Sequence, residues 1–207
     1  TILHAYEEWG KEVVTKLRGM FVFVIYDLQT KQLFGARDFF GIKPLYYTTL
    51  ADGTFMFSSE IKTFMRHPEF KPELNKTALK SFMMNQYNDL QETFFKGVFR
   101  FPAGHYFTYQ DGQLDIEKYW DMSFNPSNLS FEEEVAKIDA AVEESVKAHN
   151  VADVPVGAFL SEGVDSSYVT SILQPQEVFS VGFDDQTYNE VTAARALADE
   201  LGLNFNE

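Results

Sequence analysis

One stretch near the end of the chain limits the possible folds more than any other. Residues 154–160 carry only apolar side chains or glycine, and the polar turn Ser161-Glu162-Gly163 follows them. A short apolar run of this kind is typical of a strand that is buried on both faces, as in parallel sheets. Asp165-Ser166-Ser167 then begins a segment of helical character that stops before Gln174-Pro175. A loop between a strand end and a helix start presents free backbone N–H groups, so the stretch predicts an anion-binding joint. An ordinary strand-turn-helix connection fits the pattern equally well.

Composition narrows the class of protein. The chain has 207 residues, and its 45% hydrophobic content includes 21 Phe and 10 Tyr, enough for one large or two modest packed domains. The net charge of −14 disfavours nucleic acid and anionic membranes as partners, because no run of Lys or Arg concentrates positive charge. The chain contains no cysteine and no apolar run of membrane-spanning length. We therefore expect a cytoplasmic protein, and a homodimer is compatible with the sequence.

The first 119 residues have the pattern of an antiparallel α+β domain. Apolar residues recur every three or four positions over residues 2–17, which predicts a helix with a kink at Gly10. Asn75 has the position of an N-cap for a further helix. Asp111-Gly112 lies between two strand-like runs and predicts a two-residue hairpin turn. The strands expected in this domain are residues 20–27, 32–37, 45–50, 54–58, 104–109 and 113–119.

A change in composition predicts a linker over residues 120–129, where Asn125-Pro126-Ser127-Asn128 interrupts the apolar pattern. Ser130 and Glu133 then have the spacing of a capping box at the start of a long helix.

Strands and helices alternate in the remaining residues, 130–207. Two buried strands are expected at residues 154–160 and 178–183, and a third begins after Gly202. A helix capped by Asn189 is expected between the second and third strands, with Gly202 as its end. This alternation predicts an α/β domain with a doubly wound parallel sheet.

Three blocks in the first domain resemble the class II glutamine amidotransferase domain. The blocks are Gly19-Met20-Phe21-Val22-Phe23, Arg37-Asp38-Phe39-Phe40-Gly41-Ile42-Lys43-Pro44-Leu45-Tyr46-Tyr47 and Phe57-Ser58-Ser59-Glu60-Ile61-Lys62. Taken alone, the second block is a tight connection between two strands. Residues 160–167 resemble the Ser-Gly-Gly-x-Asp-Ser pyrophosphate loop of the ATP pyrophosphatase family, in the form found in glutamine-hydrolysing asparagine synthetases. The resemblance implies an incomplete N-terminal-nucleophile type domain at residues 1–119, followed by an incomplete ATP pyrophosphatase domain at 130–207.

The resemblance also implies a nucleotide site with ATP and Mg²⁺ as ligands. Leu160 and Val181 would contact the nucleotide, and Asp165 would face the metal ion, although a plain first-turn helix residue is the alternative for Asp165. The residues that would meet phosphate oxygens are Ser161, Gly163, Val164 and Ser166.

The function implied is that of a carbon–nitrogen ligase. ATP would adenylate the β-carboxylate of aspartate, and ammonia from glutamine would displace AMP to give asparagine. Two alternatives stay open: another amidotransferase-ligase on the same scaffold, such as a β-lactam synthetase-like enzyme, and a non-catalytic nucleotide-binding relative. The acceptor pocket would lie after Glu207. We expect the chain to be an internal fragment, since Thr1 leads directly into a helix and the last residues begin a strand.

Glu162 departs from the loop pattern, which has glycine at this position. A carboxylate about 4 Å from a phosphate charge costs on the order of 4 kcal/mol at an effective dielectric constant near 20. A helix N-terminus returns only ~0.3–1 kcal/mol. Glycine could also be required for a backbone angle or a close approach. The hypothesis is that this loop binds ATP weakly and that Glu162→Gly restores tight binding.

The 207-residue chain itself is expected to hydrolyse no glutamine. In the family that it resembles, the nucleophile is an N-terminal cysteine whose own α-amine is the base, and this chain contains no cysteine. Ammonia release with glutamine as the only substrate should equal that of buffer, and release above that rate would contradict the prediction.

Overall fold

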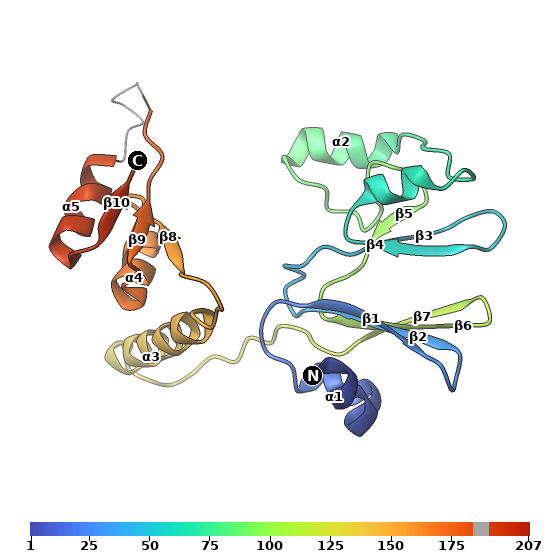
Figure 1. The fold of residues 1–207 in the computed structure, drawn as a ribbon, viewed down its shortest axis with the longest axis horizontal. Coiled ribbons are helices and arrows are strands. Elements are labelled where there is room, and N and C mark those ends of the chain that lie inside the picture. Colours follow the sequence, from blue (N-terminus) through green and yellow to red (C-terminus); the bar gives the residue numbers. More distant parts are fainter. Residues whose placement is uncertain (184–190) are drawn as a thin grey trace. The chain divides into compact units, whose positions relative to one another are not determined.

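The computed structural model describes residues 1–183 and 191–207 and divides the chain into two compact units, Thr1–Phe124 and Asn125–Glu207. The boundary between the units lies inside the predicted linker 120–129. Residues 121–130 are exposed and have no regular secondary structure (Figure 1). Within the described residues, no helix combines the length and the apolar character needed to cross a membrane.

The first unit contains mixed helix and strand with two antiparallel sheets. The four-stranded sheet has the order β1-β2-β6-β7 and the three-stranded sheet the order β4-β3-β5, and all pairings are antiparallel. The predicted hairpins are confirmed, and the Asp111-Gly112 turn has positive φ angles of 51° and 80°. The elements are α1 (Ile2–Trp9), the 3₁₀ helix η1 (Gly10–Thr15), β1 (Val22–Asp27), β2 (Gln32–Arg37), β3 (Tyr46–Thr49), β4 (Phe55–Ser58), the 3₁₀ helix η2 (Ile61–Arg66), α2 (Lys76–Asn85), β5 (Val98–Arg100), β6 (His105–Gln110) and β7 (Gln113–Lys118).

The structure contradicts one helix prediction in this unit and confirms one predicted helix cap. The single helix expected over residues 2–17 is wrong, because the α-helix ends at Trp9 and a 3₁₀ helix follows. Gly10 has φ 54° and ψ −135°, a conformation that no α-helix accommodates. The cap at Asn75 is confirmed, since its side chain accepts hydrogen bonds from the amides of Thr77 (3.1 Å) and Ala78 (3.2 Å).

Aromatic side chains fill the space between the two sheets of the first unit. Phe107 of β6 lies at the centre, with the Phe101 ring 5.4 Å and the Phe55 ring 5.8 Å from its own. Its direct cross-strand neighbour is Gly35, where a Cβ atom would lie 2.2 Å from the Phe107 ring. Glycine is therefore required at this position, because any side chain would displace the ring on which both sheets pack.

The outer faces of the two sheets are covered by helices. Val13 and Val14 of η1, together with Tyr6 of α1, pack against Phe34 on the four-stranded sheet. Phe64 of η2 packs against Val98 of the three-stranded sheet. The first unit is thus built in the order helix, sheet, sheet, helix, and a helix packs on the outer face of each sheet.

The connection from β2 to β3 is held by its own polar side chains. The Asp38 carboxylate is buried and accepts backbone hydrogen bonds from Ile42 (2.9 Å) and Lys43 (3.0 Å). The Arg37 guanidinium donates to the carbonyls of Lys43 (2.7 Å), Gly41 (2.5 Å) and Phe101. Burial lowers the pKa of Arg37. These two residues of the strongest motif in the first domain therefore stabilise the connection.

The second unit contains a parallel sheet of three short strands in the order β10-β9-β8. The capping box at its first helix is confirmed: the Ser130 hydroxyl accepts from the Glu133 amide (3.3 Å), and the Glu133 carboxylate accepts from the Ser130 amide (2.8 Å). The elements are α3 (Phe131–His149), β8 (Gly157–Phe159), α4 (Val164–Leu173), β9 (Glu177–Phe179), α5 (Val191–Leu201) and β10 (Asn204–Asn206).

The prediction that residues 154–160 form one strand buried on both faces is wrong. Only Gly157–Phe159 pair with β9, because Pro155 has no N–H for a sheet hydrogen bond. Val178 and its neighbours on one face pack against α5, whereas Phe159 is 80% and Phe179 43% exposed on the other. The expected N-cap Asn189 lies outside the described residues, and α5 ends before Gly202, which has φ 68°.

Replacing Tyr119 by Phe tests the hydrogen bond that closes the first unit around its Arg37 connection. The Tyr119 hydroxyl donates to the Arg37 carbonyl at 2.7 Å, so we expect Tyr119→Phe to lower the free energy of unfolding by about 1 kcal/mol. Burial, with a smaller contribution from Asp38, raises the pKa of Tyr119. The folded state therefore holds this proton more tightly than the unfolded state, and stability should fall as the pH rises above about 10.

Urea denaturation at neutral and alkaline pH measures both effects, and Tyr119→Phe should lose less stability on alkaline titration than the unmodified chain. Tyr26→Phe is the matched control, because Tyr26 is half exposed on β1. Identical unfolding midpoints for Tyr119→Phe and the unmodified chain would contradict the assigned role.

Candidate functional site

The site is formed where β8 and β9 end at the same edge of the parallel sheet. The buried Leu160 follows β8, and its amide donates to the Phe179 carbonyl at 2.8 Å. The Ser180 amide donates to the Asn206 carbonyl at 2.9 Å. These two bonds fix the carboxyl ends of three neighbouring strands, the edge where parallel α/β sheets bind ligands.

Helix α4 starts directly above this edge with its first amide groups free. Gly163 is the N-cap residue, with φ −67° and ψ 144°, and provides no side-chain cap. The Gly163 carbonyl accepts from the Ser167 amide at 3.1 Å, which closes the first turn. The amides of Val164, Asp165 and Ser166 have no hydrogen-bond partner among the described residues, as expected for a helix start. Together with the helix dipole they favour a negatively charged ligand.

Two serine hydroxyls meet in the loop below the helix start. The Ser161 and Ser166 Oγ atoms are 2.8 Å apart, and the Ser161 amide donates to the Ser166 Oγ at 3.2 Å. A Cβ atom at Gly163 would lie 3.2 Å from the Ser161 Oγ and 3.8 Å from the Ser166 Oγ. Glycine at this position leaves room for both hydroxyls to converge, and hydroxyl groups can donate to phosphate or carboxylate oxygens.

A cavity of about 310 Å³ opens beside these hydroxyls. Four of the residues predicted for the site line it: Leu160, Ser161, Ser166 and Val181. The other predicted residues do not line it, and Gly163, Val164 and Asp165 are exposed at the start of α4. Sequence reasoning did not assign site roles to four further residues that line the cavity, Phe159, Phe179, Ser180 and Phe183. Their position at the ends of the two predicted strands was the sequence feature that could have identified them.

Glu162 is exposed and lies outside the lining of this cavity. It is not among the residues with positive φ, and neither is Gly163. The backbone of this chain at position 162 therefore has no conformation that requires glycine, and the effect of Glu162 on ATP binding stays a prediction. Because the Glu162 side chain is exposed, solvent and salt screen its repulsion of a bound anion, which is then weaker than the figure for an effective dielectric constant near 20.

Asp165 provides one carboxylate near the loop, in the first turn of α4. No group of three candidate metal ligands occurs in the part of the chain that the structure describes. A single carboxylate fits Mg²⁺ bound mainly through phosphate oxygens and water, since this ion rarely has a site made of protein ligands alone.

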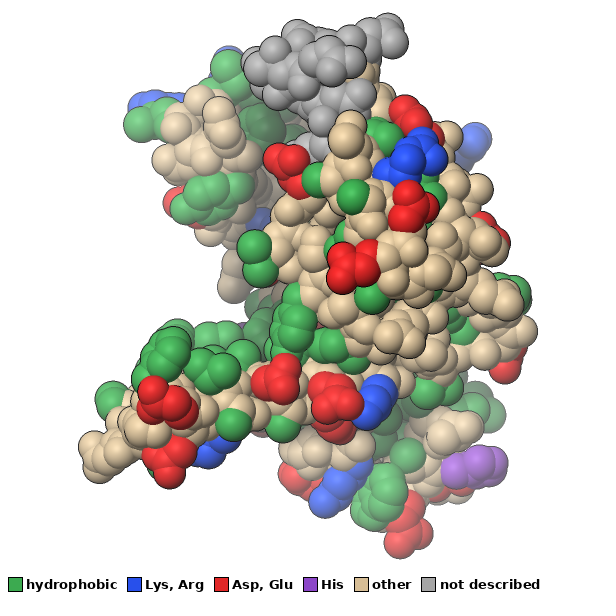
Figure 2. All heavy atoms as spheres, turned by 90° about the vertical axis from the view of Figure 1, so that its left-hand side faces the viewer, with side chains coloured by type: hydrophobic (Ala, Val, Ile, Leu, Met, Phe, Trp, Pro, Cys, Tyr) green, Lys and Arg blue, Asp and Glu red, His purple; other side chains and the backbone are tan. Residues whose placement is uncertain are grey.

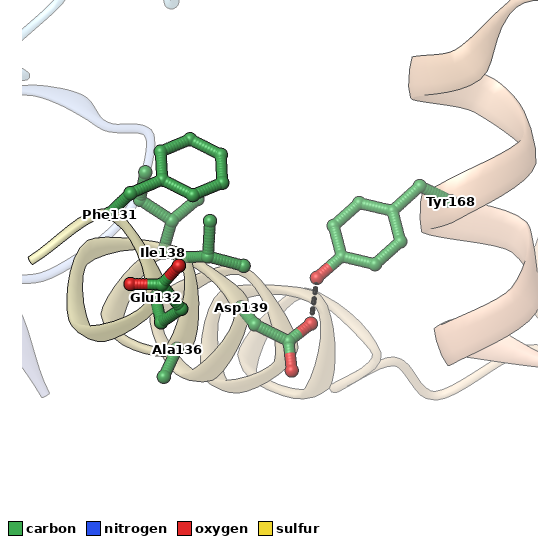
Figure 3. A pocket seen from close by; sticks show the side chains of 7 residues that line it. Phe131, Glu132, Ala136, Ile138, Asp139 and Tyr168 are labelled. Carbon is green, nitrogen blue, oxygen red and sulfur yellow. Dashed lines mark hydrogen bonds between the residues drawn. The ribbon is translucent and has the colours of Figure 1, made fainter.

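A larger cavity of about 620 Å³ lies between α3 and α4, and Figure 3 shows its lining. The Tyr168 hydroxyl donates to the Asp139 carboxylate across it, which raises the pKa of Tyr168. Its remaining lining is mostly apolar, with Phe131, Val135 and Ile138 on α3. Tyr168 and Asp139 are engaged with each other, which leaves Glu132 as the remaining charged side chain of the lining and makes this cavity a weaker candidate for an anion than the loop.

Charged side chains on the surface agree with the acidic composition. On the face drawn in Figure 2, the Lys and Arg side chains are scattered among Asp and Glu and form no continuous basic area. No Lys or Arg lines the 310 Å³ cavity, so an anion bound there would depend on backbone amides and hydroxyls.

Residues 1–120 match the family described as glutamine amidotransferase domain, and residues 137–207 match the family described as asparagine synthase. The chain is 38% identical over 207 residues to asparagine synthetase (glutamine-hydrolyzing) 1 of Bacillus subtilis (strain 168), an alignment that covers 98% of this chain and 32% of that protein. It is 36% identical over 172 residues to asparagine synthetase (glutamine-hydrolyzing) 3 of the same organism, covering 83% and 28%.

Amidase chyE of Penicillium rubens is 33% identical to the chain over 230 residues, covering 99% of this chain and 33% of that protein. The chain thus spans about a third of the length of these relatives.

Proposed function

We propose that this chain, which belongs to the glutamine amidotransferase domain family and continues into an asparagine synthase domain, is part of an ATP-dependent, glutamine-hydrolysing asparagine synthetase. The relatives named for this activity support the proposal over nearly the whole chain. The observation that carries it is the pair of converging hydroxyls below the free amides of α4.

The finer fold assignments belong to the same proposal. The order helix, sheet, sheet, helix in the first unit supports an N-terminal-nucleophile type domain. Three parallel strands with α4 between β8 and β9 support an incomplete doubly wound sheet. The predicted domain limits, 1–119 and 130–207, stay predictions, as do a cytoplasmic location and a homodimer.

The loop suits a reaction in which pyrophosphate leaves. A β-carboxylate oxygen of aspartate attacks the α-phosphorus of ATP, the bond from that phosphorus to the bridging oxygen breaks, and pyrophosphate departs with the negative charge. In this proposal the Ser161 and Ser166 hydroxyls and the α4 amides would donate hydrogen bonds to the departing oxygens, which the convergence of the two hydroxyls supports. Asp165 would hold Mg²⁺, which neutralises phosphate charge when it is bound.

The second half of the reaction uses ammonia. Ammonia attacks the acyl carbon of the aspartyl-adenylate, the carbon–oxygen bond to AMP breaks, and asparagine is formed after loss of a proton. In the proposed enzyme, glutamine supplies this ammonia through the amidotransferase domain. The first unit of this chain contributes scaffold to that domain, and no glutaminase nucleophile is assigned within it.

The product pattern of the full-length protein tests the proposal. Aspartate, ATP and glutamine should give asparagine, glutamate, AMP and pyrophosphate, which mass spectrometry resolves. Formation of ADP and phosphate instead would contradict an adenylating site. The similarity to an amidase keeps another amide-forming reaction as the second candidate, and amidation of a different carboxylate in an acceptor panel would favour it.

Ser166→Ala in the full-length protein tests the loop hydroxyls directly. Loss of a hydrogen bond to a charged oxygen should weaken binding of inorganic pyrophosphate by about tenfold or more. Ser171→Ala is the matched control on the same helix, because the Ser171 hydroxyl donates to the Tyr168 carbonyl at 2.8 Å and does not line the cavity. Calorimetry that finds both variants equal to the unmodified protein would contradict the role of Ser166.

Glu162→Gly should raise ATP affinity by less than about tenfold, because the exposed carboxylate is screened by solvent. Glu162→Gln is the control that removes the charge and keeps the side chain. An increase of a hundredfold or more in both variants would re-establish strong repulsion as the effect of Glu162. An increase in ATP affinity in Glu162→Gly alone would indicate that the loop backbone at position 162, and not the charge of Glu162, limits binding.

A further inference from the structure

Arg195 of α5 forms an ion pair with Glu207, which follows β10 at the edge of the parallel sheet where the candidate site lies. The Arg195 guanidinium donates to the Glu207 carboxylate at 2.8 Å. Its central carbon also lies 4.4 Å from the centre of the Phe205 ring, a cation–π contact. Phe205 pairs with Val178 in the sheet and packs against the core of the second unit. The sheet therefore sets the position of the guanidinium.

The Glu207 carboxylate lies against the backbone of Gly182. A Cβ atom at Gly182 would lie 2.6 Å from the Glu207 Oε1 atom, too short for a real contact, and 3.2 Å from the Val191 Cγ2 atom. Gly182 is not among the glycines with positive φ, so it does not need glycine for its backbone angle. What glycine supplies here is room for the carboxylate to approach the chain.

Gly182 separates two residues that line the 310 Å³ cavity, Val181 and Phe183, and does not line the cavity itself. Val181 is 64% and Phe183 59% exposed, so burial in the core does not hold this segment in place. The Glu207 carboxylate contacts the segment at Gly182 and also lies outside the cavity lining. This contact can therefore fix the cavity wall without touching an occupant.

A surface ion pair without a role is the alternative. The Arg195 and Glu207 side chains are 48% and 49% exposed, and exposed pairs usually contribute little to stability. The Phe205 ring under the guanidinium and the Gly182 backbone against the carboxylate restrict both partners further. An effect of this pair should accordingly be seen in the geometry of the cavity wall more than in the stability of the fold.

We propose that Arg195 and Glu207 are positioning residues that hold residues 181–183 in the arrangement in which the cavity accepts ATP. The proposal rests on the proposed function, because it assumes that ATP occupies this cavity. It assigns a role to two charged residues outside the cavity lining. Changing either of them should alter the use of ATP and leave the protein folded.

Steady-state kinetics of asparagine formation by the full-length protein test the proposal. Arg195→Met and Glu207→Gln each remove one charge at similar size. Each should raise the KM for ATP by about three- to tenfold and change kcat by less than about twofold, because neither residue touches the reacting atoms. The double variant should be no worse than the single ones, since both changes break the same contact. Arg195→Lys can still form the pair and should restore most of the lost affinity.

Lys147→Met is the matched control. Lys147 pairs with Glu143 on α3, and neither residue lines the cavity. Its KM for ATP should equal that of the unmodified protein. Thermal unfolding midpoints of all these variants should agree with that of the unmodified protein, because every pair concerned is exposed.

The outcomes separate this proposal from the proposed function. Unmodified full-length protein that does not use ATP would overturn the proposed function, and the positioning role with it. Active unmodified protein and an unchanged KM for ATP in Arg195→Met and Glu207→Gln would overturn the positioning role alone. A KM that rises equally in Lys147→Met, or that rises only together with a loss of thermal stability, would also overturn it.

Discussion

The hydrogen bond from the Leu160 amide to the Phe179 carbonyl is the constraint on which the candidate site depends. It extends the parallel pairing of β8 and β9 by one residue, so that both strands end at the same edge. The chain between the two strands, which includes α4, must then cross back over the sheet so that β9 can start beside β8 and run parallel to it. As a result, the Ser166 hydroxyl and Ser180 line one cavity although a complete helix separates them along the chain.

The packing of the two sheets in the first unit depends on a glycine that faces a phenylalanine across neighbouring strands. Phe107 occupies the space above Gly35, and further aromatic rings of both sheets surround it. Arg37 and Asp38 begin the motif at residues 37–47. Their side chains form hydrogen bonds with backbone groups of the connection from β2 to β3. Arg37 and Asp38 therefore act as scaffold in the first unit.

Much of this arrangement could be predicted from the sequence, wherever a local signal decides the outcome. The hairpin at Asp111-Gly112 and the caps at Asn75 and Ser130 formed as expected, because each depends on a few neighbouring residues. The strand at residues 154–160 was predicted too long, since apolar character does not show which residues find a pairing partner. That Ser180 lines the cavity could not be predicted either, because its position depends on tertiary pairing with β10.

The mutual hydrogen bond of Ser161 and Ser166 has a consequence for selectivity. Each hydroxyl is the other's partner, and both also bond to backbone groups of the loop, so these contacts fix the shape of the loop. A neutral acceptor gains little by separating them, because one ordinary hydrogen bond is exchanged for another. An ionised oxygen forms a stronger bond and shifts the exchange in its favour. By this exchange, the pair favours ionised acceptors over neutral ones.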